Sequence, residues 1–153
     1  MPRAKRLLVL CCLLWAGMLL GISFLEAWVK FQAPSLTRAV GLDVGVTVFS
    51  ALQLTEIIWL ALIGLLIATG GQRSRATLAG GLTLAVSIAL QRWLLMPELS
   101  AQAAIIIAGG DHPGSWHHLA YGIIEVIKLA TLLTLAWQAM AESKRQQQDQ
   151  SSS

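Results

Sequence analysis

Four long apolar stretches constrain the fold of this chain more than any other feature of its sequence. They occupy about residues 7–28, 44–68, 76–96 and 115–140. About 20 helical residues cross the hydrocarbon core of a bilayer, which is roughly 30 Å thick, so each stretch can span a membrane. Charged residues make up only 12% of the chain, about half the share of a soluble domain. The sequence thus predicts an all-α integral membrane protein, with one domain over residues 1–142 built as a bundle of four transmembrane helices.

The ends of these stretches carry further signals. The first apolar run is longer than the roughly 7–15 residues of a signal-peptide core, and no small-x-small cleavage site follows it, so we expect an uncleaved helix. Pro97 disfavours helical geometry in the residue before it, so the third helix should end at Met96. The apolar stretch 103–108 is too short to span, and is either an interfacial helix or a continuation of the third helix. The Gln- and Ser-rich segment 143–153 should be a disordered cytoplasmic tail.

The basic residues that flank the apolar stretches predict the orientation, because cytoplasmic flanks are enriched in Lys and Arg. Seven of them fall on one side: Arg3, Lys5, Arg6, Arg73, Arg75, Lys144 and Arg145. Three fall on the other side: Lys30, Arg38 and Arg92. We therefore expect both termini in the cytoplasm, and the segments around Pro34 and from Pro97 to Gly114 on the outer side.

Three ionisable residues lie deep in the apolar stretches, namely Glu56 in the second and Glu125 and Lys128 in the fourth. An ionised side chain at mid-bilayer costs about 2.5–3.5 kcal/mol on insertion scales unless it is paired or hydrated. At about 100° per residue, Glu125 and Lys128 fall on one face of a helix together with Tyr121. The pattern predicts a polar intramembrane site with these three charges at its centre, approached from the outer side along Gln53, Gln91, His118 and Tyr121.

A purely structural interpretation of the same residues stays open. Glu125 and Lys128 are spaced i, i+3 and can neutralise each other within one helical turn. Glu56 is then a surplus carboxyl, which either stays protonated or shares Lys128. Trp15, also at mid-membrane, fits a core residue.

Several function classes find little support in the sequence. His117 and His118 are adjacent and diverge by about 100°, which is poor geometry for a metal, and no second helix supplies a histidine for haem. Cys11 and Cys12 lie side by side without a CxxC or Cys/His spacing, so they fit apolar packing residues. The basic residues form short flanks rather than a face, which argues against nucleic-acid binding. No nucleophile–base pair or phosphate loop is present, so we expect neither an enzyme nor a bound cofactor or metal.

The chain also resembles a known family over most of residues 7–140. The likeness rests on residues 33–36 and 48–49 around the start of the second stretch, on residues 91–99 with Pro97 at the end of the third, and on His118 at the start of the fourth. These resemble the small bacterial proteins with a TMEM205-like (DUF4149) domain. The chain departs from them at Glu125 and Lys128, where Asn or apolar residues are expected. The resemblance implies a four-helix membrane fold and no established biochemical activity.

Two hypotheses for function follow. In the first, this is a multi-pass protein of the bacterial inner membrane whose polar site serves transport or proton handling. Four helices enclose only a narrow conduit, so homo-oligomerisation would be needed for passage. In the alternative, it is a non-catalytic structural subunit or assembly factor whose polar stripes bind another membrane protein. An enclosed, water-filled cleft would favour the first hypothesis, and an exposed polar stripe in the monomer would favour the second.

Overall fold

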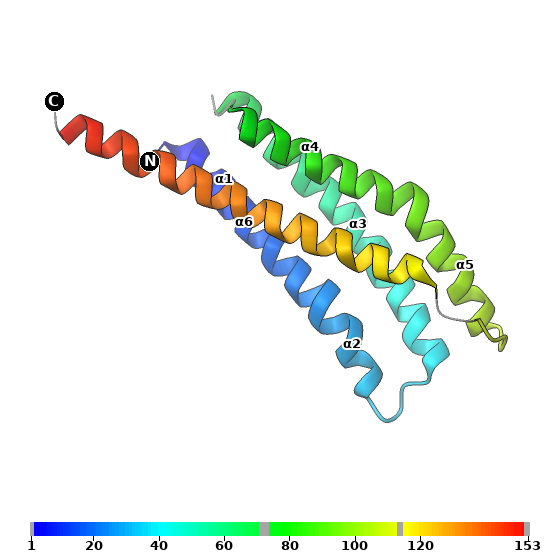
Figure 1. The fold of residues 1–153 in the computed structure, drawn as a ribbon. Coiled ribbons are helices and arrows are strands. Elements are labelled where there is room, and N and C mark those ends of the chain that lie inside the picture. Colours follow the sequence, from blue (N-terminus) through cyan, green and yellow to red (C-terminus); the bar gives the residue numbers. More distant parts are fainter. Residues whose placement is uncertain (1, 71–73, 113–114, 152–153) are drawn as a thin grey trace.

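The computed structural model describes residues 2–70, 74–112 and 115–151, with side chains as far as Ser143. Over this part of the chain the backbone forms four long helical rods joined by short connections, and no strand is present (Figure 1). Each rod is long and apolar enough to cross a membrane. The expected all-α architecture is confirmed: the protein is a small, multi-pass integral membrane protein.

The rods are longer than the apolar stretches alone. The first comprises α1 (Arg3–Leu19), the π-helical η1 (Leu20–Glu26), α2 (Ala27–Val29) and the 3₁₀ turn η2 (Lys30–Gln32). The second is α3 (Arg38–Thr69). The third comprises α4 (Arg75–Leu90), the π-helical η3 (Gln91–Leu95) and α5 (Met96–Ile107). The fourth is α6 (Trp116–Ser151).

Short polar side chains start two of the rods. The Thr37 hydroxyl accepts a hydrogen bond from the Val40 amide at 3.3 Å, and the Ser74 hydroxyl accepts one from the Thr77 amide at 3.1 Å. Each bond satisfies one of the amides that the first turn of a helix leaves without a carbonyl partner. These caps stabilise the first turns of α3 and α4 and so help to determine where the two helices begin.

The third rod does not end before Pro97, so the predicted stop at Met96 is wrong. Pro97 lies in the first turn of α5, directly after the π-helical segment η3 of the same rod. The preceding π-helical turn η3 already departs from the regular α-helical hydrogen-bond ladder that proline would interrupt. Helical backbone therefore continues to Ile107, and the stretch 103–108 continues the third helix rather than forming a separate interfacial one.

The C-terminal segment also differs from its expectation. We expected residues 143–153 to be disordered, but α6 is helical as far as Ser151, and residues 152–153 lie outside the described part. The segment contains Lys, Arg and four Gln, which are good helix formers, and extending an existing helix needs no new nucleus. The polar composition of this segment excludes a packed core, but it does not exclude a projecting helix.

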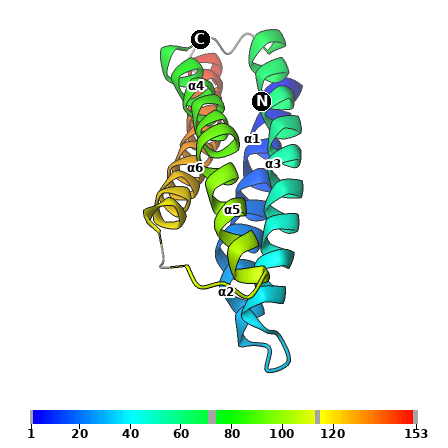
Figure 2. The ribbon, with the colours of Figure 1, turned by 90° about the vertical axis from the view of Figure 1, so that its right-hand side faces the viewer.

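The four rods form an up-and-down bundle in which each packs against two others. The first rod packs against α6 and α3, while α4 packs against α3 and α6, so consecutive rods are neighbours and the ring closes between first and last (Figures 1 and 2). An ion pair between Lys5 Nζ and Glu142 Oε2, 3.0 Å apart, joins the start of α1 to α6. Both termini therefore lie at one end of the bundle, called the terminal end below. The opposite end, with the connections before α3 and before α6, is called the far end.

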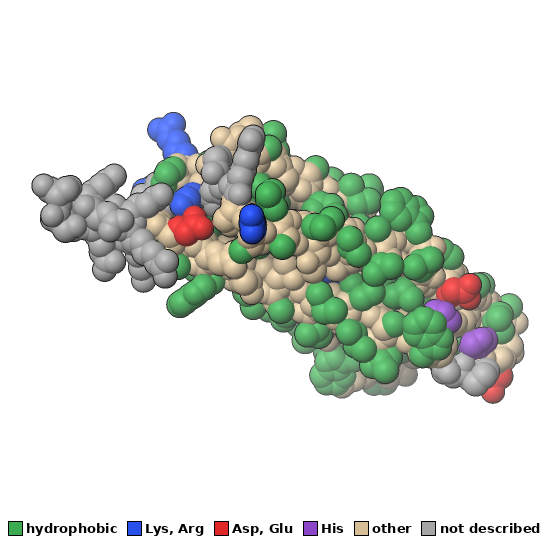
Figure 3. All heavy atoms as spheres, turned by 45° about the horizontal axis from the view of Figure 1, so that its top comes forward, with side chains coloured by type: hydrophobic (Ala, Val, Ile, Leu, Met, Phe, Trp, Pro, Cys, Tyr) green, Lys and Arg blue, Asp and Glu red, His purple; other side chains and the backbone are tan. Residues whose placement is uncertain are grey.

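The surface matches a lipid environment. Apolar side chains cover the middle of the face in Figure 3, whereas most visible basic groups lie toward the terminal end and the histidines toward the far end. Exposed hydroxyls on the helices donate to carbonyls one turn back, which leaves them no need for water. They belong to Thr47, Ser50, Thr55, Thr69, Thr83, Thr131 and Thr134.

Candidate functional site

Three charged side chains meet in the interior of the bundle. Lys128 on α6 donates to Glu56 Oε1 on α3 and, at 2.9 Å, to Glu125 Oε1 one turn earlier on its own helix. The exposed fractions are 0% for Glu56 and Lys128 and 2% for Glu125. Lys128 and Glu142 are fourteen residues apart in α6, or about 21 Å along its axis, so the ammonium lies far from the terminal end. These three residues are called the charged cluster below.

Neutral donors from the other two rods complete the charged cluster. The indole Nε1 of Trp15 on α1 donates to Glu56 Oε1 at 3.2 Å. The Gln91 amide on η3 donates to Glu125 Oε1 at 2.9 Å and makes a longer contact of 3.4 Å with the Tyr121 carbonyl. Every rod of the bundle therefore supplies a group to the charged cluster. Gln91 opens the π-helical turn, and such turns are frequent at functional sites because they change the direction of a side chain.

The charged cluster is not balanced in charge. Two carboxylates and one ammonium leave one negative charge when all three are ionised, and that charge is in a low-dielectric interior. Several buried polar atoms near it lack a hydrogen-bond partner among the described residues. They are Glu56 Oε2, Glu125 Oε2, Gln91 Oε1, Tyr121 Oη and both polar atoms of the Gln53 amide. Buried polar atoms are nearly always paired, so these atoms have hydrogen-bonding capacity that the described residues do not use.

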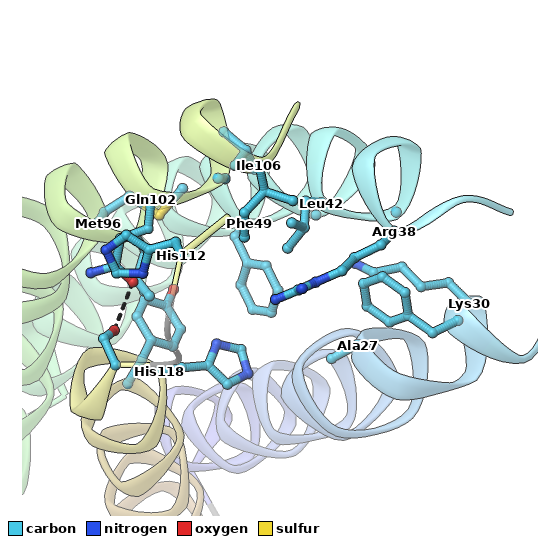
Figure 4. Close-up of a pocket in the computed structure, with 18 residues that line it drawn as sticks. Ala27, Lys30, Arg38, Leu42, Phe49, Met96, Gln102, Ile106, His112 and His118 are labelled. Carbon is cyan, nitrogen blue, oxygen red and sulfur yellow. Dashed lines mark hydrogen bonds between the residues drawn. The ribbon is translucent and has the colours of Figure 1, made fainter. Parts of the chain in front are cut away.

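A cavity lies at the far end, on the other side of Tyr121 from the charged cluster. Its volume is about 300 Å³, and α2, α3, α5 and the start of α6 line it (Figure 4). Tyr121 is part of its wall and packs edge-on against Phe49, with ring centroids 5.4 Å apart. Glu125 follows Tyr121 by one helical turn, about 6 Å along α6. The Phe49 and Tyr121 rings therefore form an aromatic layer in the cavity wall nearest the charged cluster.

The terminal side of the charged cluster is filled by apolar side chains. Leu84, Leu132 and Ile63 are fully buried there, and Leu135 packs so closely on Gly80 that a Cβ on the glycine would lie 2.7 Å from Leu135 Cδ2. These residues belong to one continuous core that also includes Leu8, Cys12, Ile67, Ile88, Ala136 and Ala139. Among the described residues, the side of the charged cluster toward the termini is thus mainly apolar, including an open apolar hollow between α3 and α4, whereas the cavity with polar lining lies toward the far end.

The structure places the predicted site residues in three positions. Glu56, Glu125, Lys128 and Gln91 are in direct contact. Gln53 and Tyr121 are buried between the charged cluster and the cavity, with the Gln53 amide facing the Tyr121 hydroxyl outside hydrogen-bond geometry. His118 does not reach the charged cluster: it lines the cavity, seven residues or about 10 Å before Glu125 along α6.

Three residues that contact the charged cluster or line the cavity were not predicted from the sequence to do so. Trp15 was expected to be a core residue, yet its indole N–H binds Glu56. A buried indole N–H needs an acceptor, and the carboxylate of Glu56, which is also at mid-membrane, can supply one. Phe49 and Arg38 line the cavity, and no pattern in the sequence indicates that role for them.

No described group of three or more His, Cys, Asp or Glu side chains is arranged to hold a metal ion. His112 and His118 both line the cavity, but no acidic or thiol side chain joins them in its wall. The arrangement of the charged cluster, with its own ammonium between two carboxylates, favours proton exchange over binding of a divalent cation.

Comparison of the chain with protein-family models, with curated proteins and with solved structures finds no match. The resemblance to the TMEM205-like domain therefore stays a prediction that rests on the quoted residues alone.

Proposed function

We propose that this membrane protein binds and releases a proton at the charged cluster, in exchange with the side of the membrane that the far end faces. The observation that carries the proposal is the shared lysine: one buried ammonium serves two buried carboxylates. One added proton makes the charged cluster neutral. The free oxygens Glu56 Oε2 and Glu125 Oε2 are the two places where it can be held.

The path for the proton is supported by the asymmetry of the interior. Toward the far end, the Phe49 and Tyr121 rings and the buried Gln53 amide lie between the charged cluster and the cavity. Toward the terminal end, the apolar core extends for several helical turns. The described basic side chains at the terminal end, among them Arg3, Arg6 and Arg75, favour a cytoplasmic terminal end, so the exchange is assigned to the outer side.

Burial of the polar residues also bears on the alternative function. A structural subunit or assembly factor that used this polar stripe to bind a partner would present it on its surface. Glu56, Gln91 and Lys128 are instead fully buried within the bundle. The alternative would have to use other residues, and the experiment below separates the two functions.

The test compares Glu56→Gln with the wild-type protein in liposomes. Glutamine keeps the shape of the side chain and its hydrogen bonding but cannot ionise, so it removes the proton site without emptying the space. We expect the wild type to show a protonated-carboxyl infrared band that changes with external pH, and the variant to lose that change. A pH-sensitive dye trapped in the liposomes reports whether exchange is coupled to movement of protons across the membrane.

Glu142→Gln is the matched control, because Glu142 is a half-exposed carboxyl at the terminal end. It should leave the pH-dependent band unchanged. If Glu56→Gln and Glu125→Gln both leave the band as in the wild type, proton binding by the charged cluster is wrong. The structural alternative would then be the better description of the protein.

A further inference from the structure

The far-end cavity is basic at its mouth and apolar along its walls. Its described lining contains two strongly basic residues, Lys30 and Arg38, together with His112 and His118, and no acidic side chain. Most of the remaining wall is apolar, with Leu42, Phe49, Met96 and Ile106 among the residues drawn in Figure 4. A cavity of about 300 Å³ is at the lower end of the range for small-molecule sites.

The two cations differ in how far their charge is already compensated. Lys30 Nζ lies 3.2 Å from Glu26 Oε1 on the same rod, and it also lies over the Phe31 and Phe49 rings. Arg38 has no carboxylate within ion-pair distance among the described residues, and its guanidinium points into the cavity in Figure 4. The cavity therefore has about one positive charge that the described part of the chain does not balance.

The polar wall opposite these cations is fixed by internal hydrogen bonds. The Ser115 hydroxyl donates to Gln102 Oε1 at 2.7 Å, and Gln102 Nε2 pairs with His117 Nδ1 at 3.3 Å. Gln102 is thus held in one orientation at the edge of the cavity before any ligand enters. Groups held in this way orient a ligand at little entropic cost.

We propose that this cavity binds a monoanionic amphiphile, with its carboxylate or phosphate on Arg38 and its apolar chain between α2, α3 and α5. Guanidinium binds either anion through paired N–H donors, and the apolar wall excludes small hydrophilic anions. The anion has two possible sources, a free single-chain carboxylate and the head group of an anionic lipid. The proposal does not depend on proton binding at the charged cluster, because Arg38 precedes Glu56 by eighteen residues, about 27 Å along α3.

The experiment measures displacement of a dansyl-labelled undecanoic acid probe from the protein in phosphatidylcholine nanodiscs, with empty nanodiscs subtracted. Decanoate should displace the probe at least about tenfold more effectively than decanol, because only the anion binds the guanidinium. Phosphatidylglycerol mixed into the nanodiscs forms the second arm. Stronger competition by decanoate identifies the free acid as the ligand, and stronger competition by phosphatidylglycerol identifies the lipid.

Three variants make the assignment specific. Arg38→Gln should weaken probe binding by about tenfold, whereas Arg6→Gln, which removes an exposed arginine at the terminal end, should leave it unchanged. Ala27→Phe should abolish binding by placing a ring in the cavity without changing its charge. Equal displacement by decanoate and decanol, or equal binding by Arg38→Gln and Arg6→Gln proteins with wild-type melting temperatures, would overturn the proposal. Glu56→Gln should bind the probe normally, which keeps this test independent of proton binding.

Discussion

The terminal and far halves of the bundle are built from the same four rods but are filled differently. In the terminal half, the interior is mostly apolar, and Gly80 lets α4 and α6 approach closely through Leu135. An open apolar hollow also lies between α3 and α4 there, lined by Ile63, Gly64 and Gly81 among others, and no charged side chain lines it. In the far half, the rods leave a cavity between α2, α3 and α5, and π-helical segments occur in the first and third rods. The charged cluster lies at the boundary between the two halves.

This difference suggests a division of roles along each helix. Close packing stabilises the bundle, since lipid provides little hydrophobic force between helices and van der Waals contact must replace it. In the far half, polar atoms of Gln53 and Tyr121 are buried without partners, an arrangement that costs stability and that the proposed proton exchange would use. Substitutions in each half show whether the terminal half supports the polar half in this way.

The largest effect is expected for Lys128→Met. The substitution leaves Glu56 and Glu125 buried without their shared counter-charge, which should cost about 3–5 kcal/mol and greatly reduce the folded yield. The measurement is the free energy of unfolding by sodium dodecyl sulfate titration in mixed micelles. Neutralising one carboxyl with Glu125→Gln should restore part of the loss, and adding Glu56→Gln should restore most of it.

Additivity is the outcome that would contradict this account. Independent sites combine to within about 0.3–0.5 kcal/mol, whereas members of one charged cluster do not. If Lys128→Met costs as much with neutral carboxyls as with ionisable ones, the three groups do not interact. The boundary between the halves would then be a packing feature rather than an electrostatic one.

A smaller effect is expected in the terminal half for Gly80→Val. The new side chain would overlap Leu135, and overpacking of this kind costs about 1–3 kcal/mol. Gly64→Val is the matched control on α3, because nothing lies within 4 Å of a Cβ placed there. Both variants bear the same change in helix propensity, so the difference between their unfolding free energies reports the helix contact alone. Equal losses would show that the terminal half is not closely packed at Gly80.

The sequence predicted the broad plan of the fold because the relevant energies are large and local. A span of apolar residues and the cost of an ionised side chain in hydrocarbon do not depend on details of packing. Those two terms were enough to predict four rods and to place Glu56, Glu125 and Lys128 in the interior. They do not fix which carboxylate binds the lysine, since that depends on the relative height and rotation of α3 and α6.

Other features depend on small differences in backbone and packing energy, which cannot be inferred from residue types alone. Continuation of the helix through Pro97 required the π-helical turn of η3, whose hydrogen-bond pattern has no simple sequence signal. The cavity depends on the path of α2 and α5 relative to α6, which is a property of the whole bundle. The donor role of Trp15 followed from its height beside Glu56 rather than from its residue type.

The smallest effect on stability, and the sharpest test of the boundary between the halves, is expected for Tyr121→Phe. Its hydroxyl is buried without a hydrogen-bond partner, so removing it should change the unfolding free energy by less than about 0.5 kcal/mol or raise it slightly. The ring contact with Phe49 is kept, and the aromatic layer between cavity and charged cluster stays in place. Proton exchange should nevertheless slow, because the Tyr121 hydroxyl and the Gln53 amide are the buried polar groups between the cavity and Glu125, and of these two the hydroxyl is the one that can both donate and accept a proton readily. The measurement is the rate at which the protonated-carboxyl infrared band responds to a step in external pH.

Phe49→Leu serves as the comparison: it removes the ring contact but keeps the hydroxyl, so it should lower stability more and slow the response less. A faster or unchanged response in Tyr121→Phe would show that protons reach the charged cluster by another path, and the open far half would then serve the cavity alone.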